Sequence, residues 1–148
     1  MLQIQVKTYT ELTKEELYKI LQLRSQVFVV EQNCVYQDID FKDQKAIHIL
    51  GFKNNKIIAY TRVFKSGDYF NEASIGRVVV AEKERKYKYG YAIMEASIKA
   101  ISTYFNETTI KISAQTYLIK FYNSLGFNQI GDVYLEDGIP HIKMIKNS

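Results

Sequence analysis

A loop rich in cations is the part of the sequence best suited to bind a charged ligand. It runs from Lys83 to Lys88, where four of six residues are lysine or arginine, and it lies between an apolar run and a helical pattern that opens at Gly90. This order directs backbone N–H groups and a helix N-terminus to one place, with cations around it, and such a place binds phosphate. The same order also occurs in connections whose charges face water, so the loop alone leaves both interpretations open.

The spacing of apolar and turn-forming residues predicts the elements that position this loop. Thr13 and Glu16 form a capping box, which indicates the start of a helix. The expected strands and remaining helices, in chain order, are the strands Gln3–Tyr9, His48–Phe52, Lys56–Phe64 and Ser74–Val80, the helix Tyr91–Phe105, the strand Thr109–Ala114, the helix Thr116–Leu125, and the strands Asn128–Leu135 and Ile139–Ile145. The apolar stripe of the long helix comprises Ile93, Met94, Ser97, Ile98, Ile101, Tyr104 and Phe105. Asn-Asn at 54–55 and Asp-Gly at 137–138 predict hairpin turns.

The order of these elements indicates an α+β fold. It places helices beside a mostly antiparallel sheet, with a parallel contact possible where the long helix crosses over. No repeat, low-complexity tract or linker divides the sequence, so we expect a single domain over residues 1–148.

The composition narrows the class of protein. Hydrophobic residues make up 47% of the 148 positions, which suffices for a core. A net charge of +4 permits binding to polyanions without requiring it. A single cysteine, Cys34, excludes an intramolecular disulfide, and with only two histidines it argues against a structural zinc site, so we expect no metal. We see neither a leader pattern nor an apolar run long enough to span a membrane, and we expect a cytoplasmic protein without a membrane partner.

Several motifs taken together resemble one family of enzymes. The patterns V-V-V-x-x-x-x-R-x-x-x-x-G-x-x-x-M at 78–94 and F-Y-N-S-L-G-F at 121–127 look like those of the GCN5-related N-acetyltransferase (GNAT) superfamily. Within this superfamily the chain resembles the ElaA-like subgroup. Five segments carry this resemblance: F-V-V-E-Q-N-C at 28–34, H-I-L-G-F at 48–52, I-G-R-V-V-V at 75–80, A-Q-x-Y at 114–117 and E-D-G-I-P-H at 136–141. The resemblance covers most of the chain and implies the GNAT acyltransferase fold. It also implies an N-acetyltransferase that moves the acetyl group of acetyl-coenzyme A (acetyl-CoA) directly to an amine in a ternary complex.

The resemblance further implies which residues hold acetyl-CoA. The strand at 78–80 is expected to splay from its neighbour and to pair its backbone with the pantetheine arm. A glutamine at the end of a later strand is expected to hydrogen-bond the same region. The implied cofactor-binding residues are Val78, Val79, Val80, Arg85, Lys86, Tyr87, Lys88, Tyr89, Gly90, Tyr91 and Gln115.

Lys88 departs from the family pattern Q/R-x-x-G-x-G/A, because it stands where the first glycine is expected. A left-handed backbone at this position would cost a lysine roughly 1–2 kcal/mol, whereas a right-handed one would cost little. The ammonium of Lys88 or Lys86 would then offer the phosphates a charge-assisted contact.

The resemblance implies that Tyr122 is the general acid that stabilises or protonates the thiolate leaving group, the alternative being a tyrosine that only packs a helix. For the general base, Glu31 is the first candidate, because its apolar neighbours at 28–30 are expected to desolvate it and raise its pKa. His141 and His48 are the other candidates, since imidazole titrates near neutral pH. For each histidine a structural role is the alternative.

Asp38, Asp40 and Asp43 lack the glycine and terminal glutamate of an EF-hand loop, so they predict a solvated or substrate-attracting acidic loop rather than a calcium site. Cys34 has no histidine or aspartate partner at a recognised spacing and is expected to be a structural thiol.

Two rival functions remain open from the sequence. One is an acetyl-CoA-binding module without turnover, in which Lys88, at the position of the family glycine, would indicate a degraded or altered site. The other is an RNA-binding α+β domain, but its recognition motif is absent and nucleic acid is not expected. The acceptor amine, which could be a small molecule or a peptide, and the choice between monomer and homodimer also remain open.

Overall fold

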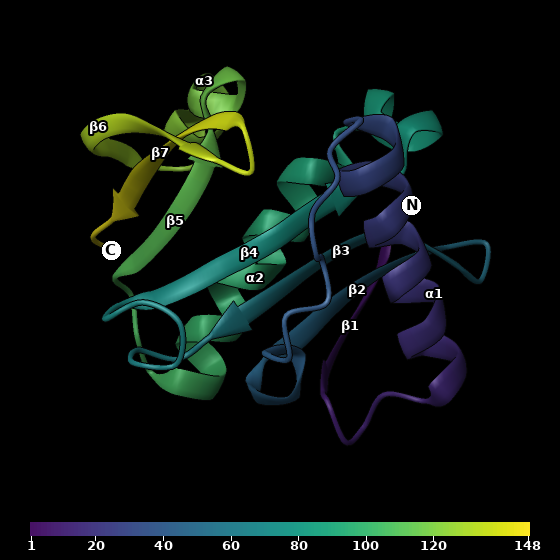
Figure 1. The fold of residues 1–148 in the computed structure, drawn as a ribbon. Coiled ribbons are helices and arrows are strands. Elements are labelled where there is room, and N and C mark those ends of the chain that lie inside the picture. Colours follow the sequence, from purple (N-terminus) through teal and green to yellow (C-terminus); the bar gives the residue numbers. More distant parts are fainter.

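A twisted sheet of seven strands forms the centre of the molecule, seen in a computed structural model that describes residues 1–148 (Figure 1). Its strand order is β1-β2-β3-β4-β5-β7-β6, and every neighbouring pair is antiparallel except β4 and β5. The strands are β1 (Gln3–Thr8), β2 (Ile47–Lys53), β3 (Lys56–Phe64), β4 (Ala73–Val80), β5 (Ile110–Gln115), β6 (Asn128–Glu136) and β7 (Ile139–Lys146). The predicted α+β fold, with a mixed and mostly antiparallel sheet flanked by helices, is confirmed.

Three α-helices and several shorter helical turns complete the fold. They are α1 (Lys14–Arg24), η1 (Ser25–Glu31), η2 (Asp43–Lys45), η3 (Glu82–Tyr87), α2 (Tyr89–Phe105), η4 (Thr116–Leu118) and α3 (Ile119–Ser124). None of them combines the length and the apolar composition needed to cross a lipid bilayer.

Helix α1 begins where the capping box predicts. The hydroxyl of Thr13 accepts a hydrogen bond from the Glu16 backbone N–H at 3.0 Å, and the Glu16 carboxylate accepts one from the Thr13 N–H at 3.0 Å. After Arg24 the chain continues as the π-helical turn η1, whose wider winding carries Phe28 and Gln32 to the wall of a cavity.

Both predicted hairpin turns form. Asn54 and Asn55 have positive φ angles of 50° and 64°, and Asp137 and Gly138 have 52° and 77°. Two consecutive residues of positive φ match the twist of antiparallel strands, which explains why asparagine, aspartate and glycine occupy these positions.

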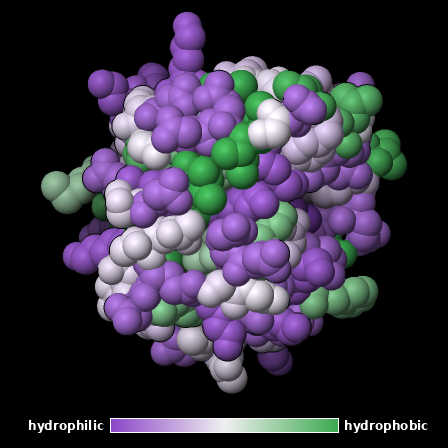
Figure 2. All heavy atoms as spheres, turned by 90° about the vertical axis from the view of Figure 1, so that its left-hand side faces the viewer, coloured by the Kyte–Doolittle hydropathy of each residue, from purple (hydrophilic) through white to green (hydrophobic).

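Helices α1 and α2 cover opposite faces of the sheet. Leu50 and Tyr60 pack with α1, whereas their chain neighbours Ile49 and Ala59 pack with α2, as the alternation of side chains along a strand requires. The apolar stripe predicted for α2 is largely confirmed, but Tyr104 is 54% exposed. It lies in the last turn of the helix, where a tyrosine can keep its polar end in water. Hydrophilic residues predominate on the face shown in Figure 2, where hydrophobic ones gather only in short bands.

Strands β4 and β5 separate soon after they meet. Only Ala73 and Ser74 pair with β5, opposite Ile110 and Lys111. Beyond Ser74 the edge of β4 that faces β5 has no strand partner, and the two strands diverge visibly (Figure 1). The predicted splaying of the segment around Val78 is therefore confirmed.

A β-bulge bends β4 in the same region. Its register with β3 shifts between Tyr60 and Arg62, so that Arg77 and Val78 together lie opposite one residue of β3. Arg77 has a φ of 49°, and its side chain points to the loop that follows η1.

That loop is held by a buried network of three arginines and three aspartates. Arg24 binds Asp38 at 2.9 Å and Asp43 at 2.8 Å, and Arg62 binds Asp43 at 2.9 Å. Three further contacts complete the network, Arg62–Asp40 at 2.6 Å, Arg77–Asp38 at 2.8 Å and Arg77–Asp40 at 3.6 Å. The prediction of a solvated or substrate-attracting acidic loop is wrong, because arginines from α1, β3 and β4 neutralise these aspartates.

The network should make folding stability depend on acid. Burial alone would raise the pKa of Asp40, but the hydrogen bonds and charge of Arg62 outweigh it and hold this pKa well below its usual range. A pKa that is lower in the folded state gives stability that is complete above about pH 4 and is lost as the pH falls below it. We expect Asp40→Asn to lose about 1.5–3 kcal/mol of unfolding free energy near pH 7, and the gap to wild type to narrow as the pH falls from about 4 to about 2.

Urea unfolding at both pH values measures this effect. Asp132→Asn is the matched control, because Asp132 is exposed and no lysine, arginine or histidine nitrogen lies within 4.0 Å of its carboxylate. A constant gap between Asp40→Asn and wild type across the pH range would contradict the role of the ion pair.

Candidate active site

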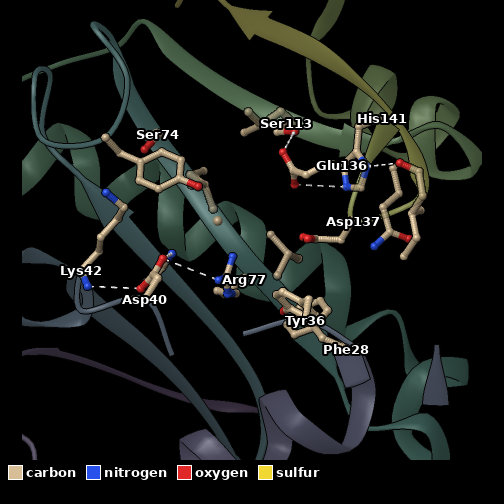
Figure 3. A pocket seen from close by; sticks show the side chains of 18 of the residues that line it. Phe28, Tyr36, Asp40, Lys42, Ser74, Arg77, Ser113, Glu136, Asp137 and His141 are labelled. Carbon is tan, nitrogen blue, oxygen red and sulfur yellow. Dashed lines mark hydrogen bonds and ion pairs between the residues drawn. The ribbon is translucent and has the colours of Figure 1, made fainter. Parts of the chain in front are cut away.

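A cavity of about 500 Å³ opens where β4 and β5 diverge (Figure 3). Its wall comes from η1, the loop after it, β3, the β3–β4 loop, β4, β5, the region around α3, the β6–β7 turn and β7. Of the residues predicted to form the site, Val78, Gln115, Tyr122 and His141 line this cavity. Glu31 and the loop from Arg85 to Tyr91 do not.

Tyr122 lies in α3 and reaches the cavity from the side of β5. It is 5% exposed and packs edge-on against Phe121 and Phe127. Burial raises the pKa of its hydroxyl well above the usual value, with a smaller contribution from nearby Tyr117. The hydroxyl therefore carries its proton throughout the physiological pH range.

His141 is oriented by its own strand and by the adjacent turn. Its Nδ1 lies 2.7 Å from the carbonyl oxygen of Ile139. A carbonyl can only accept, so Nδ1 carries the hydrogen, and Nε2 is the basic atom of the neutral ring. Nε2 lies 3.5 Å from the Glu136 carboxylate, and the ring stacks on Tyr134. This arrangement can accept a proton at Nε2 and stabilise the resulting cation.

Glu31 does not have the desolvated, free carboxylate that the sequence predicts. Its two oxygens accept hydrogen bonds from Arg85 at 2.5 and 2.7 Å, and the guanidinium also donates to the carbonyl of Val80 at 3.1 Å. A carboxylate held in this way must give up a charge-assisted pair before it accepts a proton. The geometry therefore favours His141 over Glu31 as the base.

The surroundings of His48 indicate a structural role. It is fully buried, with one ring nitrogen 2.6 Å from the Tyr60 hydroxyl and the other 2.9 Å from the Asp43 carbonyl. Burial lowers the pKa of this imidazole, so it stays neutral. It does not line the cavity, so the structural alternative holds for this residue.

The basic loop forms the turn η3 and leads directly into α2. Lys88 has φ 61° and ψ 27°, so its backbone is left-handed and carries the strain that the sequence left undecided. No side chain caps the N-terminus of α2. The Tyr91 N–H donates to the Lys88 carbonyl at 3.2 Å, whereas the N–H groups of Tyr89 and Gly90 precede the first intrahelical hydrogen bond. A side chain at Gly90 would meet the Phe121 ring at 3.3 Å, so glycine permits the close approach of α2 and α3.

Gln115 and Cys34 each form one hydrogen-bonding contact that fixes the side chain. The side-chain amides of Gln115 and Gln32 bond to each other at 3.2 and 3.3 Å across the cavity wall. The buried Cys34 lies 3.3 Å from the carbonyl oxygen of Asp137, where it joins the loop after η1 to the β6–β7 turn.

Sequence reasoning missed Glu136 and Ser113, which join His141 at the cavity. Ser113 lies within hydrogen-bond distance of Glu136 at 3.2 Å and also contacts the Tyr134 hydroxyl. The two-residue turn at 137–138 already fixed the hairpin register that pairs Glu136 with Ile139, so it could have placed Glu136 beside His141.

The fold and site define an acyltransferase of the GNAT class. The model of the family described as "Acetyltransferase (GNAT) domain" matches residues 7–148, and the chain belongs to this family. Among its relatives is Protein ElaA of Escherichia coli K12, which is 43% identical over 148 residues, 99% of this chain and 97% of ElaA.

Solved structures agree with this assignment. The crystal structure of Escherichia coli ElaA superposes with a TM-score of 0.92 at 42% identity and covers 99% of this chain and 100% of that one. An acyl-CoA N-acyltransferase from Pseudomonas aeruginosa gives a TM-score of 0.93 at 36% identity, with 99% of each chain covered. The GNAT fold and the ElaA-like resemblance are confirmed.

The left-handed conformation of Lys88 allows its backbone strain and its charge to be tested separately. Lys88→Gly removes the charge and relieves the strain, whereas Lys88→Ala removes the charge alone. We expect the glycine variant to be about 1 kcal/mol more stable than the alanine variant in urea unfolding.

Coenzyme A titrations in rising salt complete this test. If Lys88 contacts the phosphates, both variants should show the same reduced salt dependence of affinity relative to wild type. Equal stabilities of the two variants would contradict strain at this position, and an unchanged salt dependence would contradict the phosphate contact.

Proposed function

We propose that the protein is an acetyl-CoA-dependent N-acetyltransferase that transfers the acetyl group directly to an amine in a ternary complex. The divergence of β4 from β5 carries the proposal. It leaves one backbone edge of β4 free, next to the uncapped N-terminus of α2, and opens onto a cavity that Tyr122 and His141 both line.

The chain's own groups fit the cofactor. The edge of β4 at Val78–Val80 has no strand partner on the β5 side, and only the Val80 carbonyl is engaged there, by Arg85 at 3.1 Å. This edge can pair with the amide-containing pantetheine arm as an added strand would. The N–H groups at Lys88–Gly90 can hold the pyrophosphate, because the next one, that of Tyr91, already donates to the Lys88 carbonyl. Arg85, Lys86 and Lys88 supply positive charge nearby. Gln115 lies on the β5 side of the same opening. When bound, acetyl-CoA would supply the activated carbonyl that the amine attacks.

The acceptor amine must lose a proton before it attacks. An amine with a pKa near 10.4 is mostly protonated at about pH 7. The gap of about 3.4 pH units, at about 1.36 kcal/mol per unit, makes its deprotonation cost roughly 4.6 kcal/mol. We assign this proton to His141 Nε2, because Nδ1 donates to the Ile139 carbonyl and the Glu136 carboxylate lies 3.5 Å from Nε2, where it can stabilise an imidazolium.

Tyr122 acts on the leaving group. Because burial holds the pKa of its hydroxyl above the usual value, the phenol remains a hydrogen-bond donor throughout the reaction. Full transfer of its proton to a thiolate with a pKa of about 8.5 is uphill by more than about 2 kcal/mol. The hydroxyl therefore stabilises the departing sulfur first and gives up its proton late.

Replacement of Tyr122 separates an enzyme from a module that only binds acetyl-CoA. We expect Tyr122→Phe to lower kcat about 10²-fold or more in an assay of thiol release, with acetyl-CoA affinity by calorimetry almost unchanged. Tyr104→Phe is the control, because Tyr104 is exposed at the end of α2. Binding of acetyl-CoA with no turnover of any amine would favour the binding module, and no binding at all would overturn both.

Replacement of His141 tests the base through its dependence on pH. We expect His141→Gln to lower kcat about 10²-fold near pH 7, and the deficit to shrink as the pH approaches about 10, where water alone deprotonates the amine. A purely structural role would give a deficit that does not change with pH, and that result would contradict the assignment.

A further inference from the structure

The two arginines that line the cavity are neutralised by aspartates of the loop after η1. Asp40 and Arg62 form a bidentate ion pair with N–O distances of 2.9 and 2.6 Å, and Arg77 binds Asp38 at 2.8 Å. None of these groups offers a free charge to a substrate. The charges available to an acceptor are therefore those without a partner of opposite sign.

One free cation lies at one end of the cavity. The Lys42 ammonium has no carboxylate within 4.0 Å and lies 5.6 Å from the centre of the Tyr69 ring. Its hydrogen bond to Asp40, marked in Figure 3, comes from the Lys42 backbone N–H and leaves the ammonium free.

The same end holds buried polar atoms without a hydrogen-bond partner. The Ser74 hydroxyl and the Arg62 Nε have none, and both residues are 1% exposed and line the cavity. The register that pairs Arg62 with Gly76 and Phe64 with Ser74 places them as diagonal neighbours on one face of the sheet. Buried donors without partners are rare in folded proteins, and here they adjoin the free cation.

The free acids lie at the other end. Glu136 has no arginine or lysine partner, and Asp137 forms no ion pair. The Glu136 carboxylate lies between Ser113 of β5 and His141. Figure 3 shows Lys42 and Ser74 on one side of the cavity and Glu136, Asp137 and His141 on the opposite side. The wall between the two ends includes the apolar faces of Phe28, Tyr36, Phe64, Tyr69 and Phe70.

From this separation of charge we infer that the acceptor is an ω-amino carboxylate, a molecule with a primary amine and a carboxylate at opposite ends of an apolar stem. The ammonium lies at Glu136 and Asp137, where His141 Nε2 can remove its proton. The carboxylate lies at the Lys42 ammonium, next to the Ser74 hydroxyl. This inference rests on the proposed acetyl transfer and specifies its substrate class.

A matched series of acceptors tests the inference under saturating acetyl-CoA. γ-Aminobutyrate, its amide, butylamine and putrescine share one stem and differ at the end that would meet Lys42, and longer ω-amino carboxylates with their amides extend the series. We expect the best carboxylate to exceed its amide and the simple amine about tenfold or more in kcat/KM, because it alone gains a charge-assisted contact. Putrescine should be poorest, because its second ammonium faces Lys42.

Lys42→Gln then shows whether the preference comes from this site. The variant should lower kcat/KM for the best carboxylate about tenfold and bring it close to its amide. Lys45→Gln is the matched control, since Lys45 is exposed nearby in the sequence but does not line the cavity.

The outcomes separate the substrate class from the activity itself. Equal or better turnover of putrescine, or an unchanged preference in Lys42→Gln, overturns the inference and leaves acetyl transfer standing. Bound acetyl-CoA with no turnover anywhere in the series also overturns it. Failure to bind acetyl-CoA at all overturns the proposed function instead.

Discussion

The site depends on how little of β4 is joined to β5. Two residue pairs connect the strands, at Ala73 and Ser74, and a bulge at Arg77 then bends β4 away. A sheet that continued past this point would satisfy the free edge of β4 and close the cavity. Because it does not, a backbone edge without a strand partner, a helix N-terminus and a cavity come together, and the proposed acetyl transfer uses all three.

The buried arginines and aspartates set the other wall. Arg24, Arg62 and Arg77 come from three different elements and converge on the loop after η1, so this loop is fixed to the sheet although it has almost no regular structure of its own. An isolated buried charge would be strongly unfavourable, but here each has a partner. The same pairing leaves Lys42 and the acids of the β6–β7 turn as the charges that a substrate can meet.

Local signals in the sequence predicted most of the fold. Alternating residues, the capping box at Thr13 and the two hairpin turns each depend on neighbours a few positions apart, and they gave the correct elements in the correct order. Glu31 shows what such signals miss, because its partner Arg85 is 54 residues away and comes near only when η1 lies against the loop before α2. The conformation of Lys88 was also beyond local reasoning, since the surrounding fold imposes the left-handed backbone. The cofactor loop and Tyr122 were predicted from the resemblance of their motifs to the family. The position of Glu136 beside His141 could have been predicted only from the register of the β6–β7 hairpin.

Amide hydrogen exchange with and without acetyl-CoA tests the central claim most directly, because it reports on the backbone groups said to bind the cofactor. We expect slower exchange in two separate segments, Val78–Val80 and Lys88–Gly90, with little change in β6 at the far edge of the sheet. Protection confined to other segments, or none in either of these two at saturating acetyl-CoA, would contradict it.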